Sequence, residues 1–339
     1  MSRDLIFGVL AGAASALLVM AAASSPLGLL LGYLAPLPLF FAGLTRGVMP
    51  ALAAAITGGA VSAVYGPMAA AMFMLLFGLP AFWLVRQALL ARPAIEAGPD
   101  AEALSGSGPE DGFGALEWYP VGSLLVWLAA WAAGLVIIAW LFTAGREGGL
   151  GGYLQPLLLQ VFSATLPVQS GAEAGGEGTA AAELAGRLAR IMPAVMAASW
   201  MLMLAVNGVL AQGLAGMLKQ NRRPPPRYGA LTLPRFLAIA LPALIAAALL
   251  AGNAGADAGT VAMALAAITA FPMFMRGLAV VHAMAGTAPA TGLVLAAFYA
   301  ALVVAGALVG MLVVILGLIE EWAGIRRRLA AKGTSRESE

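Results

Sequence analysis

Two polar side chains in one apolar stretch are the first candidates for chemistry. Arg276 lies within the apolar segment 258–283, and His282 follows it near the end that we expect to face the cytoplasm. A charge at the centre of a bilayer costs about 2.5–3.5 kcal/mol on insertion scales. Arg276 therefore anchors an anionic substrate group, pairs with a buried carboxylate, or snorkels to the interface. No acidic partner is evident within the predicted spans. His282 either senses pH or binds a ligand, or it is an interfacial histidine without a special role.

Two prolines and one amide complete the set of candidate ligand-binding residues. Pro36 and Pro38 lie in the middle of a predicted membrane helix, where each removes a backbone donor and interrupts the helix. In lipid, the freed carbonyl groups must be satisfied by protein, water or ligand. Transporters build binding sites near the midplane from such broken helices, and simple kinking is the alternative. Asn207, on a later helix, either hydrogen-bonds across helices or lines a cavity.

The sequence lacks the residues that most catalytic and metal sites need. It has no cysteine and one histidine, which excludes thiolate nucleophiles and multi-histidine metal sites. Neither G-x-x-x-x-G-K-[ST] nor H-E-x-x-H occurs, so the chain does not hydrolyse ATP by the P-loop route. We expect no enzyme activity, no metal and no cofactor. The formal net charge of +2 gives no reason to expect nucleic acid as a partner.

These residues belong to a chain that is too apolar for water. Of its 339 residues, 62% are hydrophobic and 10% are charged, and the mean hydropathy is +0.93. An average soluble domain is about 45–50% apolar and about 25% charged. Because so few polar residues are available to cover a surface in water, the lipid bilayer must be the main solvent. We predict an all-α, polytopic bundle of about 8–9 transmembrane helices in a bacterial inner membrane.

Nine segments have the length and composition of membrane helices, which need about 20 mostly apolar residues. They are 5–24, 27–44, 48–65, 67–90, 119–144, 191–218, 236–252, 258–283 and 291–319. Residues 1–90 are then an N-terminal four-helix membrane unit. The remaining membrane helices lie within 119–319.

Three further parts of the chain are predicted not to cross the membrane. Residues 91–118 form an acidic, flexible cytoplasmic linker, and residues 320–339 form a basic tail. An extracytoplasmic insertion at 145–190 has leucines at helical spacing opposed by glutamines, which indicates a helix near 148–168 that lies in the membrane interface. A second short amphipathic helix is expected at 180–190.

The distribution of arginine and lysine predicts the orientation, because cytoplasmic loops carry an excess of both. With the N-terminus in the cytoplasm, Arg3, Arg46, Arg86, Arg92 and the basic loop 219–235 are all cytoplasmic. Nine crossings would place the basic tail outside. We give the charge rule precedence and expect a cytoplasmic tail, so that either 291–319 is a re-entrant pair or another segment does not span.

Small residues spaced four apart are frequent in the predicted spans. Such pairs let membrane helices approach closely, and we interpret them mainly as internal helix-packing positions. The pairs are Gly8 and Gly12, Gly43 and Gly47, and Gly306 and Gly310.

Several short motifs point to known families. Residues 5–90 contain Gly8-Val-Leu-Ala-Gly12, Ala35-Pro36-Leu37-Pro38, Ala42-Gly43-Leu-Thr-Arg-Gly47 and Gly58-Gly59. They resemble the substrate-binding S components of energy-coupling-factor vitamin transporters, in which the first helix docks a membrane partner through small residues. The C-terminal part contains Arg276-Gly-Leu-Ala-Val-Val-His282 and Leu316-Gly-Leu-Ile-Glu320-Glu-Trp322. It is similar to the YybS-like bacterial membrane proteins, a family without an assigned function that is itself considered similar to S components.

Three functions are compatible with these observations. The first is S-component-like binding or transport of a small solute, with a membrane partner protein that supplies energy. The second is a membrane scaffold that acts through the linker, the basic loop and the tail. The third is a protein that handles a lipid or another amphiphile, with the interfacial helix as a lid. Proton-coupled transport usually relies on carboxylates within the membrane, and their scarcity here argues against a self-sufficient transporter.

Overall fold

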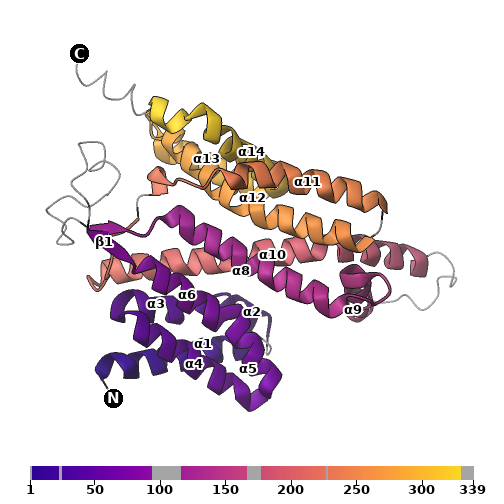
Figure 1. The fold of residues 1–339 in the computed structure, drawn as a ribbon, viewed down its shortest axis with the longest axis horizontal. Helices are drawn as coiled ribbons and strands as arrows, with labels where there is room; N and C mark the ends of the chain where they lie inside the picture. The colour runs from indigo at the N-terminus through magenta and orange to yellow at the C-terminus, as the bar shows by residue number, and fades with distance from the viewer. Residues whose placement is uncertain are drawn as a thin grey trace. The chain divides into compact units, whose positions relative to one another are not determined.

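The computed structural model describes residues 2–22, 25–93, 116–165, 177–226, 228–254 and 256–329 (Figure 1). Of the described residues, 85% are helical. Within those ranges, eight helical segments are long and apolar enough to cross a membrane: Arg3–Ala22, Leu27–Arg46, Val48–Tyr65, Pro67–Ala88, Val121–Thr143, Ala181–Met217, Asp257–Ala285 and Gly306–Ala323. The prediction of a polytopic, all-α membrane protein is confirmed.

The chain folds into two compact units, and each unit is formed from two separate stretches of the sequence. Unit 1 contains residues 1–128 and 202–232, and unit 2 contains residues 129–201 and 233–339. The sequence alone assigned everything after residue 119 to one C-terminal part, whereas the structure groups 202–232 with the N-terminal helices. Two long helices, α8 (Val121–Thr143) and α10 (Glu177–Met217), contribute to both units.

Unit 1 is built around six helical segments from the first 90 residues. They are α1 (Arg3–Ala22), α2 (Pro26–Gly32), α3 (Pro36–Arg46), α4 (Val48–Ser62), α5 (Pro67–Phe73) and α6 (Leu79–Ala88). A short 3-10 turn, η1 (Ala63–Tyr65), follows α4, and a π-helical segment, η2 (Met74–Gly78), joins α5 to α6. A second 3-10 turn, η4 (Tyr228–Ala230), lies after α10.

Glycines set the closest helix contacts in unit 1. A Cβ atom on Gly8 or Gly12 of α1 would overlap the carbonyl oxygen of Pro50 or Ala54 on α4, so the two helices touch backbone to backbone. A Cβ atom on Gly43 of α3 would overlap the side chain of Val85 on α6. These three are packing positions, as predicted. Gly47 has a φ of 105° between α3 and α4, so it serves the turn, where a positive φ favours glycine.

The ends of the predicted linker are ordered. Strands β1 (Ala91–Pro93) and β2 (Leu116–Trp118) pair antiparallel, with Arg92 opposite Glu117. The Nε of Arg92 donates to Oε2 of Glu117 over 2.7 Å, and this hydrogen bond lowers the pKa of the Glu117 carboxyl. The rest of the acidic linker, 94–115, and the end of the tail, 330–339, lie outside the described residues.

Unit 2 contains the insertion at 145–190 and helices α11 to α14. Its elements after α8 are α9 (Gly149–Thr165), the first part of α10, α11 (Phe236–Ala254), α12 (Ala256–Ala285), α13 (Thr291–Val304) and α14 (Gly306–Ala323). Helices α11 and α12 lie side by side (Figure 1). Helices α12 and α14 touch at Gly277 and Gly317, where an added Cβ would overlap the carbonyl oxygens of Val313 and Met273.

Segment 291–319, for which the sequence left a single span and a pair of segments open, is two helices that meet at Ala305, whose φ of −120° and ψ of 41° depart from helical values. Two other predicted details of unit 2 are wrong. The expected separate helix at 180–190 is the start of α10, one helix of 41 residues. Gly306 and Gly310 are not internal packing positions within the described residues, because no atom lies within 4 Å of a Cβ placed on either.

Candidate functional site

The second membrane span is broken by its prolines. Helix α2 ends at Gly32 and α3 begins at Pro36, with a turn over residues 33–35 between them. Pro36 lacks the N–H that would bond to Gly32, so the Gly32 carbonyl accepts from Ala35 N over 3.1 Å instead. Pro38 lacks the N–H for Leu34, and the Leu34 carbonyl accepts from Leu37 N over 3.0 Å. This shift leaves the Tyr33 carbonyl without its helical donor.

Side chains from other helices reach the carbonyl groups of this break. Asn207 of α10 donates its Nδ2 to the Tyr33 carbonyl oxygen over 2.7 Å. Ser15 of α1 donates its hydroxyl to the Ala35 carbonyl oxygen over 2.6 Å. Both side chains are buried. The break is therefore held by interhelical hydrogen bonds, and the structure brings Asn207 together with the turn that Pro36 and Pro38 create.

Asn207 has one unused polar atom. Its Nδ2 also donates to the Met203 carbonyl oxygen over 2.8 Å, so both amide protons are engaged by acceptors. This pattern fixes the orientation of the amide, because a flipped side chain would place oxygen against two carbonyl oxygens. Its Oδ1 is buried and has no hydrogen-bond partner among the described residues. An unpaired acceptor of this kind is available to a ligand that donates a hydrogen bond.

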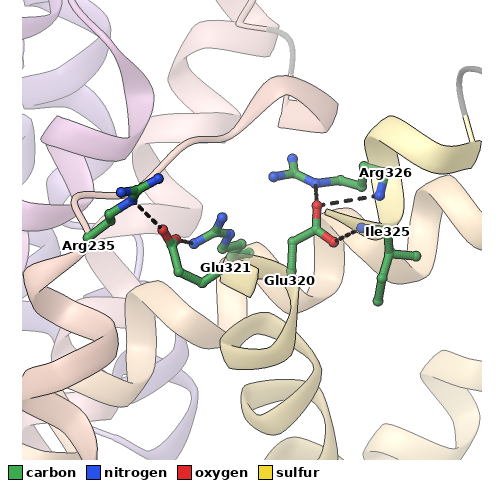
Figure 2. Close-up of polar contacts among 6 residues, drawn as sticks. Arg235, Glu320, Glu321, Ile325 and Arg326 are labelled. Atoms are coloured by element: carbon green, nitrogen blue, oxygen red, sulfur yellow. Dashed lines mark hydrogen bonds and ion pairs between the residues drawn. The ribbon is translucent and has the colours of Figure 1, made fainter. Parts of the chain in front are cut away.

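Arg276 has the carboxylate partner that the sequence did not reveal. Glu321, near the end of α14, pairs with Arg276 and also with the Nε of Arg235, at 3.3 Å (Figure 2). The side chains of Arg276 and Glu321 are 9% and 10% exposed, whereas that of Arg235 is 90% exposed. Glu321 follows the last predicted span, within which no acidic residue was evident, so the structure brings Arg276 together with a carboxylate, one of the alternatives that the sequence left open. The pairing leaves Arg276 as a neutralised link between α12 and α14.

A second carboxylate closes the end of α14. Glu320 accepts hydrogen bonds from Ile325 N over 2.7 Å and from the Nε of Arg326 over 2.9 Å (Figure 2). Gly324, with a φ of 56°, provides the turn that brings these groups back to the carboxylate. The Glu320–Glu321 pair directly after the last apolar segment was the sequence signal for both contacts. From the sequence, these residues were assigned to a family-like motif and to the start of the basic tail, and neither contact was predicted.

His282 contacts residues of its own helix and of α13 within unit 2. One ring nitrogen, Nδ1, lies 2.8 Å from the Leu278 carbonyl oxygen, and Nε2 lies 3.4 Å from the hydroxyl of Tyr299. The ring is exposed and makes an edge contact with Tyr299. Among the described residues, no three side chains of histidine, cysteine, aspartate or glutamate gather as metal ligands.

Asp257 makes interhelical hydrogen bonds that were not predicted from the sequence. It lies in the first turn of α12, where its carboxylate accepts from Trp140 Nε1 and from Leu150 N, each over 2.8 Å. Leu150 is in the first turn of α9, so the carboxylate also meets the positive end of that helix dipole. Asp257 thus joins α8, α9 and α12 within unit 2.

Comparison with known proteins identifies a family but no characterised relative. The model of a family described as "Predicted membrane protein (DUF2232)" matches residues 117–320, which is more than half of the chain. No curated protein matches the sequence, and no solved structure matches the fold.

Proposed function

The chain belongs to the DUF2232 family of predicted membrane proteins, and we propose that it binds a small solute between its membrane helices. In this proposal it depends on a membrane partner protein for energy. The absence of a P-loop motif from the sequence and the resemblance of residues 5–90 to S components support the dependence on a partner. The proposed role is not enzymatic.

One observation carries the proposal, namely the buried, unpaired Oδ1 of Asn207 beside the broken second span. Broken helices in transporters place backbone and side-chain polar groups at the level of the membrane midplane. We propose that the solute donates a hydrogen bond to Oδ1. The neighbouring Ser15, Tyr33 and Asn207 carry no charge, which favours a neutral or largely apolar solute.

Replacement of Asn207 by leucine tests the site. We expect Asn207→Leu protein, purified gently from its own membrane, to lose a small molecule that the native protein carries in native mass spectrometry. The matched control is Ser15→Ala, which removes the other hydrogen bond at the break but leaves Oδ1 in place. Leucine also removes the hydrogen bond from Asn207 to the Tyr33 carbonyl oxygen, at a cost of about 1–3 kcal/mol, so thermal unfolding is measured in parallel. A small molecule that stays bound to folded Asn207→Leu protein would contradict the proposal.

Binding of an amphiphile is the second candidate, because α9 presents an apolar face. Tyr153, Leu157 and Val161 are exposed within unit 2 and lie four residues apart, on one side of the helix. Gln155, on the other side of the helix, packs inward and donates to the Ala182 carbonyl oxygen over 3.3 Å. A helix with this division suits the membrane interface. Native protein that carries an amphiphile and no small polar molecule would favour this candidate.

We further propose that both chain ends face the cytoplasm of a bacterial inner membrane. The contact between Glu321 and Arg235 supports this, since it brings the end of α14 beside the start of α11, which follows the basic loop 219–235. Two shorter apolar helices, Phe236–Ala251 and Thr291–Val304, added to the eight long ones would give an even number of crossings.

The chain contains no cysteine, so single cysteines report orientation directly. We expect Ser2→Cys and Arg328→Cys to resist a membrane-impermeant maleimide in intact cells and to react in inverted vesicles. Ser25→Cys, in the first predicted external loop, is expected to react in intact cells. Labelling of Arg328→Cys from outside would refute the cytoplasmic tail.

A further inference from the structure

Unit 1 contains a buried arginine that has no carboxylate partner among the described residues. Arg223 is 6% exposed. Its Nη1 donates to the Ala88 carbonyl oxygen over 3.1 Å, and its Nη2 donates to the Tyr119 carbonyl oxygen over 3.5 Å. Its Nε is buried without a partner, and no described carboxylate forms an ion pair with it. Arg276, which is buried to a similar extent, has Glu321 as its counter-ion.

The described contacts of Arg223 explain its position but include no counter-ion for its charge. Ala88 is the last residue of α6, so the guanidinium meets the negative end of that helix dipole. Carbonyl groups satisfy protons without cancelling a full charge, and a buried charge without a counter-ion is strongly unfavourable. Burial accordingly lowers the pKa of the Arg223 guanidinium. An anion would relieve this cost.

Other cations lie at the same end of unit 1 as Arg223. Arg222 donates its Nε to the Thr45 carbonyl oxygen over 3.2 Å, which places it at the end of α3. Arg46 lies in the last turn of α3 and Arg86 in the last turn of α6, and Lys219 follows α10. We call these five residues, Arg46, Arg86, Lys219, Arg222 and Arg223, the cationic end. Among the described residues, the cationic end has one ion pair, between Arg46 and Asp4 at 3.7 Å. The nearby carboxylate of Glu117 pairs with Arg92, which is not part of the cationic end.

We propose that the cationic end binds the phosphate headgroup of an anionic phospholipid. It lies where three membrane helices end, which is the level of the headgroups. Basic side chains next to membrane helices attract anionic lipids, and guanidinium groups bind phosphate oxygens through paired hydrogen bonds. This site is separate from Asn207 and does not depend on the solute-binding proposal.

Lipid retention by the full chain tests the proposal. The native protein is placed in nanodiscs of phosphatidylcholine with a minor fraction of phosphatidylglycerol, and the lipids that stay bound are counted by native mass spectrometry. We expect retention of phosphatidylglycerol over phosphatidylcholine. The double variant Arg222→Gln/Arg223→Gln is expected to retain it about thirtyfold more weakly, from two lost charges near an anionic surface. The single variant Arg222→Gln changes an exposed position, and we expect it to retain phosphatidylglycerol about fivefold more weakly than the native protein. It replaces the double variant in the test if the double variant does not fold.

Arg187→Gln is the matched control, because Arg187 is an exposed arginine of unit 2 whose described partner is Glu183. It should retain phosphatidylglycerol like the native protein. Equal retention by Arg222→Gln and the native protein would overturn the proposal. Displacement of the lipid by inorganic phosphate would overturn it in favour of a soluble anion, and an acidic protein that co-purifies in place of the lipid would overturn it in favour of a protein partner.

Discussion

Replacement of Glu321 by leucine is expected to destabilise the protein by about 3–5 kcal/mol, because Arg276 then stays buried without a counter-ion. The same change also frees Arg235 from its partner. The measurement is the free energy of unfolding in mixed micelles of mild and denaturing detergent. The loss should appear as an earlier transition of unit 2, where Glu321 joins α14 to α12.

Two control variants separate the buried pair from the exposed one. Arg235→Gln should cost less than about 1 kcal/mol, because exposed ion pairs contribute little. The double variant Arg276→Met/Glu321→Leu removes both buried charges and should recover most of the loss, as replacement of a whole buried pair by apolar side chains often does. A double variant with the summed losses of its two single variants would show that the charges are not coupled.

Replacement of Gly12 by isoleucine is expected to separate α1 from α4. A Cβ at this position overlaps the Ala54 backbone, which cannot move aside as a flexible side chain can. Overpacking usually costs about 1–3 kcal/mol and sometimes more, and we expect the upper end of this range or beyond. Yield of folded protein and unfolding in detergent are the measurements.

Gly310→Ile is the matched control for Gly12→Ile. Gly310 also lies in an apolar helix, but no atom lies within 4 Å of its Cβ position. The change should stay within about 0.5 kcal/mol, as for most substitutions at open positions. Equal losses in the two variants would mean that isoleucine harms these helices through a cause other than packing against α4. Normal stability of Gly12→Ile would mean that α1 does not depend on this contact.

The close packing of Gly8 and Gly12 also bears on the proposed partner protein. In S components, small residues of the first helix dock the membrane partner, and the resemblance implied the same use here. In this chain those glycines face α4 of the same unit. A partner that binds this protein must therefore use other surfaces than the Gly8–Gly12 stripe.

Local sequence features were sufficient for much of the fold. The predicted segment 5–24 corresponds to α1, 48–65 to α4 with η1, and 258–283 to α12, each within a few residues. The break at Pro36 and Pro38 was also predictable, because a missing N–H interrupts a helix whatever surrounds it. For segment 291–319 the sequence left a single span and a pair of segments open, since no proline marks the interruption at Ala305 and the residues on both sides are equally apolar.

Contacts between residues far apart in the sequence could not be predicted from local sequence features. Asn207 was selected as a polar residue in a membrane helix, but its bond to Tyr33 joins residues from opposite parts of the chain. Arg276 was selected as a buried charge, but its partner follows the last apolar segment. Arg223 belonged to a basic loop, and its burial depends on how that loop folds against α6.

The sequence by itself determined that this protein lies in a membrane, roughly where most of its helices begin and end, and which polar residues would be costly there. These properties follow from transfer of each segment to lipid, which depends on composition within about 20 residues. Only the tertiary structure decided how those costs are met: Glu321 for Arg276, Asn207 for the broken span, and no described carboxylate for Arg223. The reason is that hydrogen bonds and ion pairs act over a few ångströms, so they depend on which helices become neighbours.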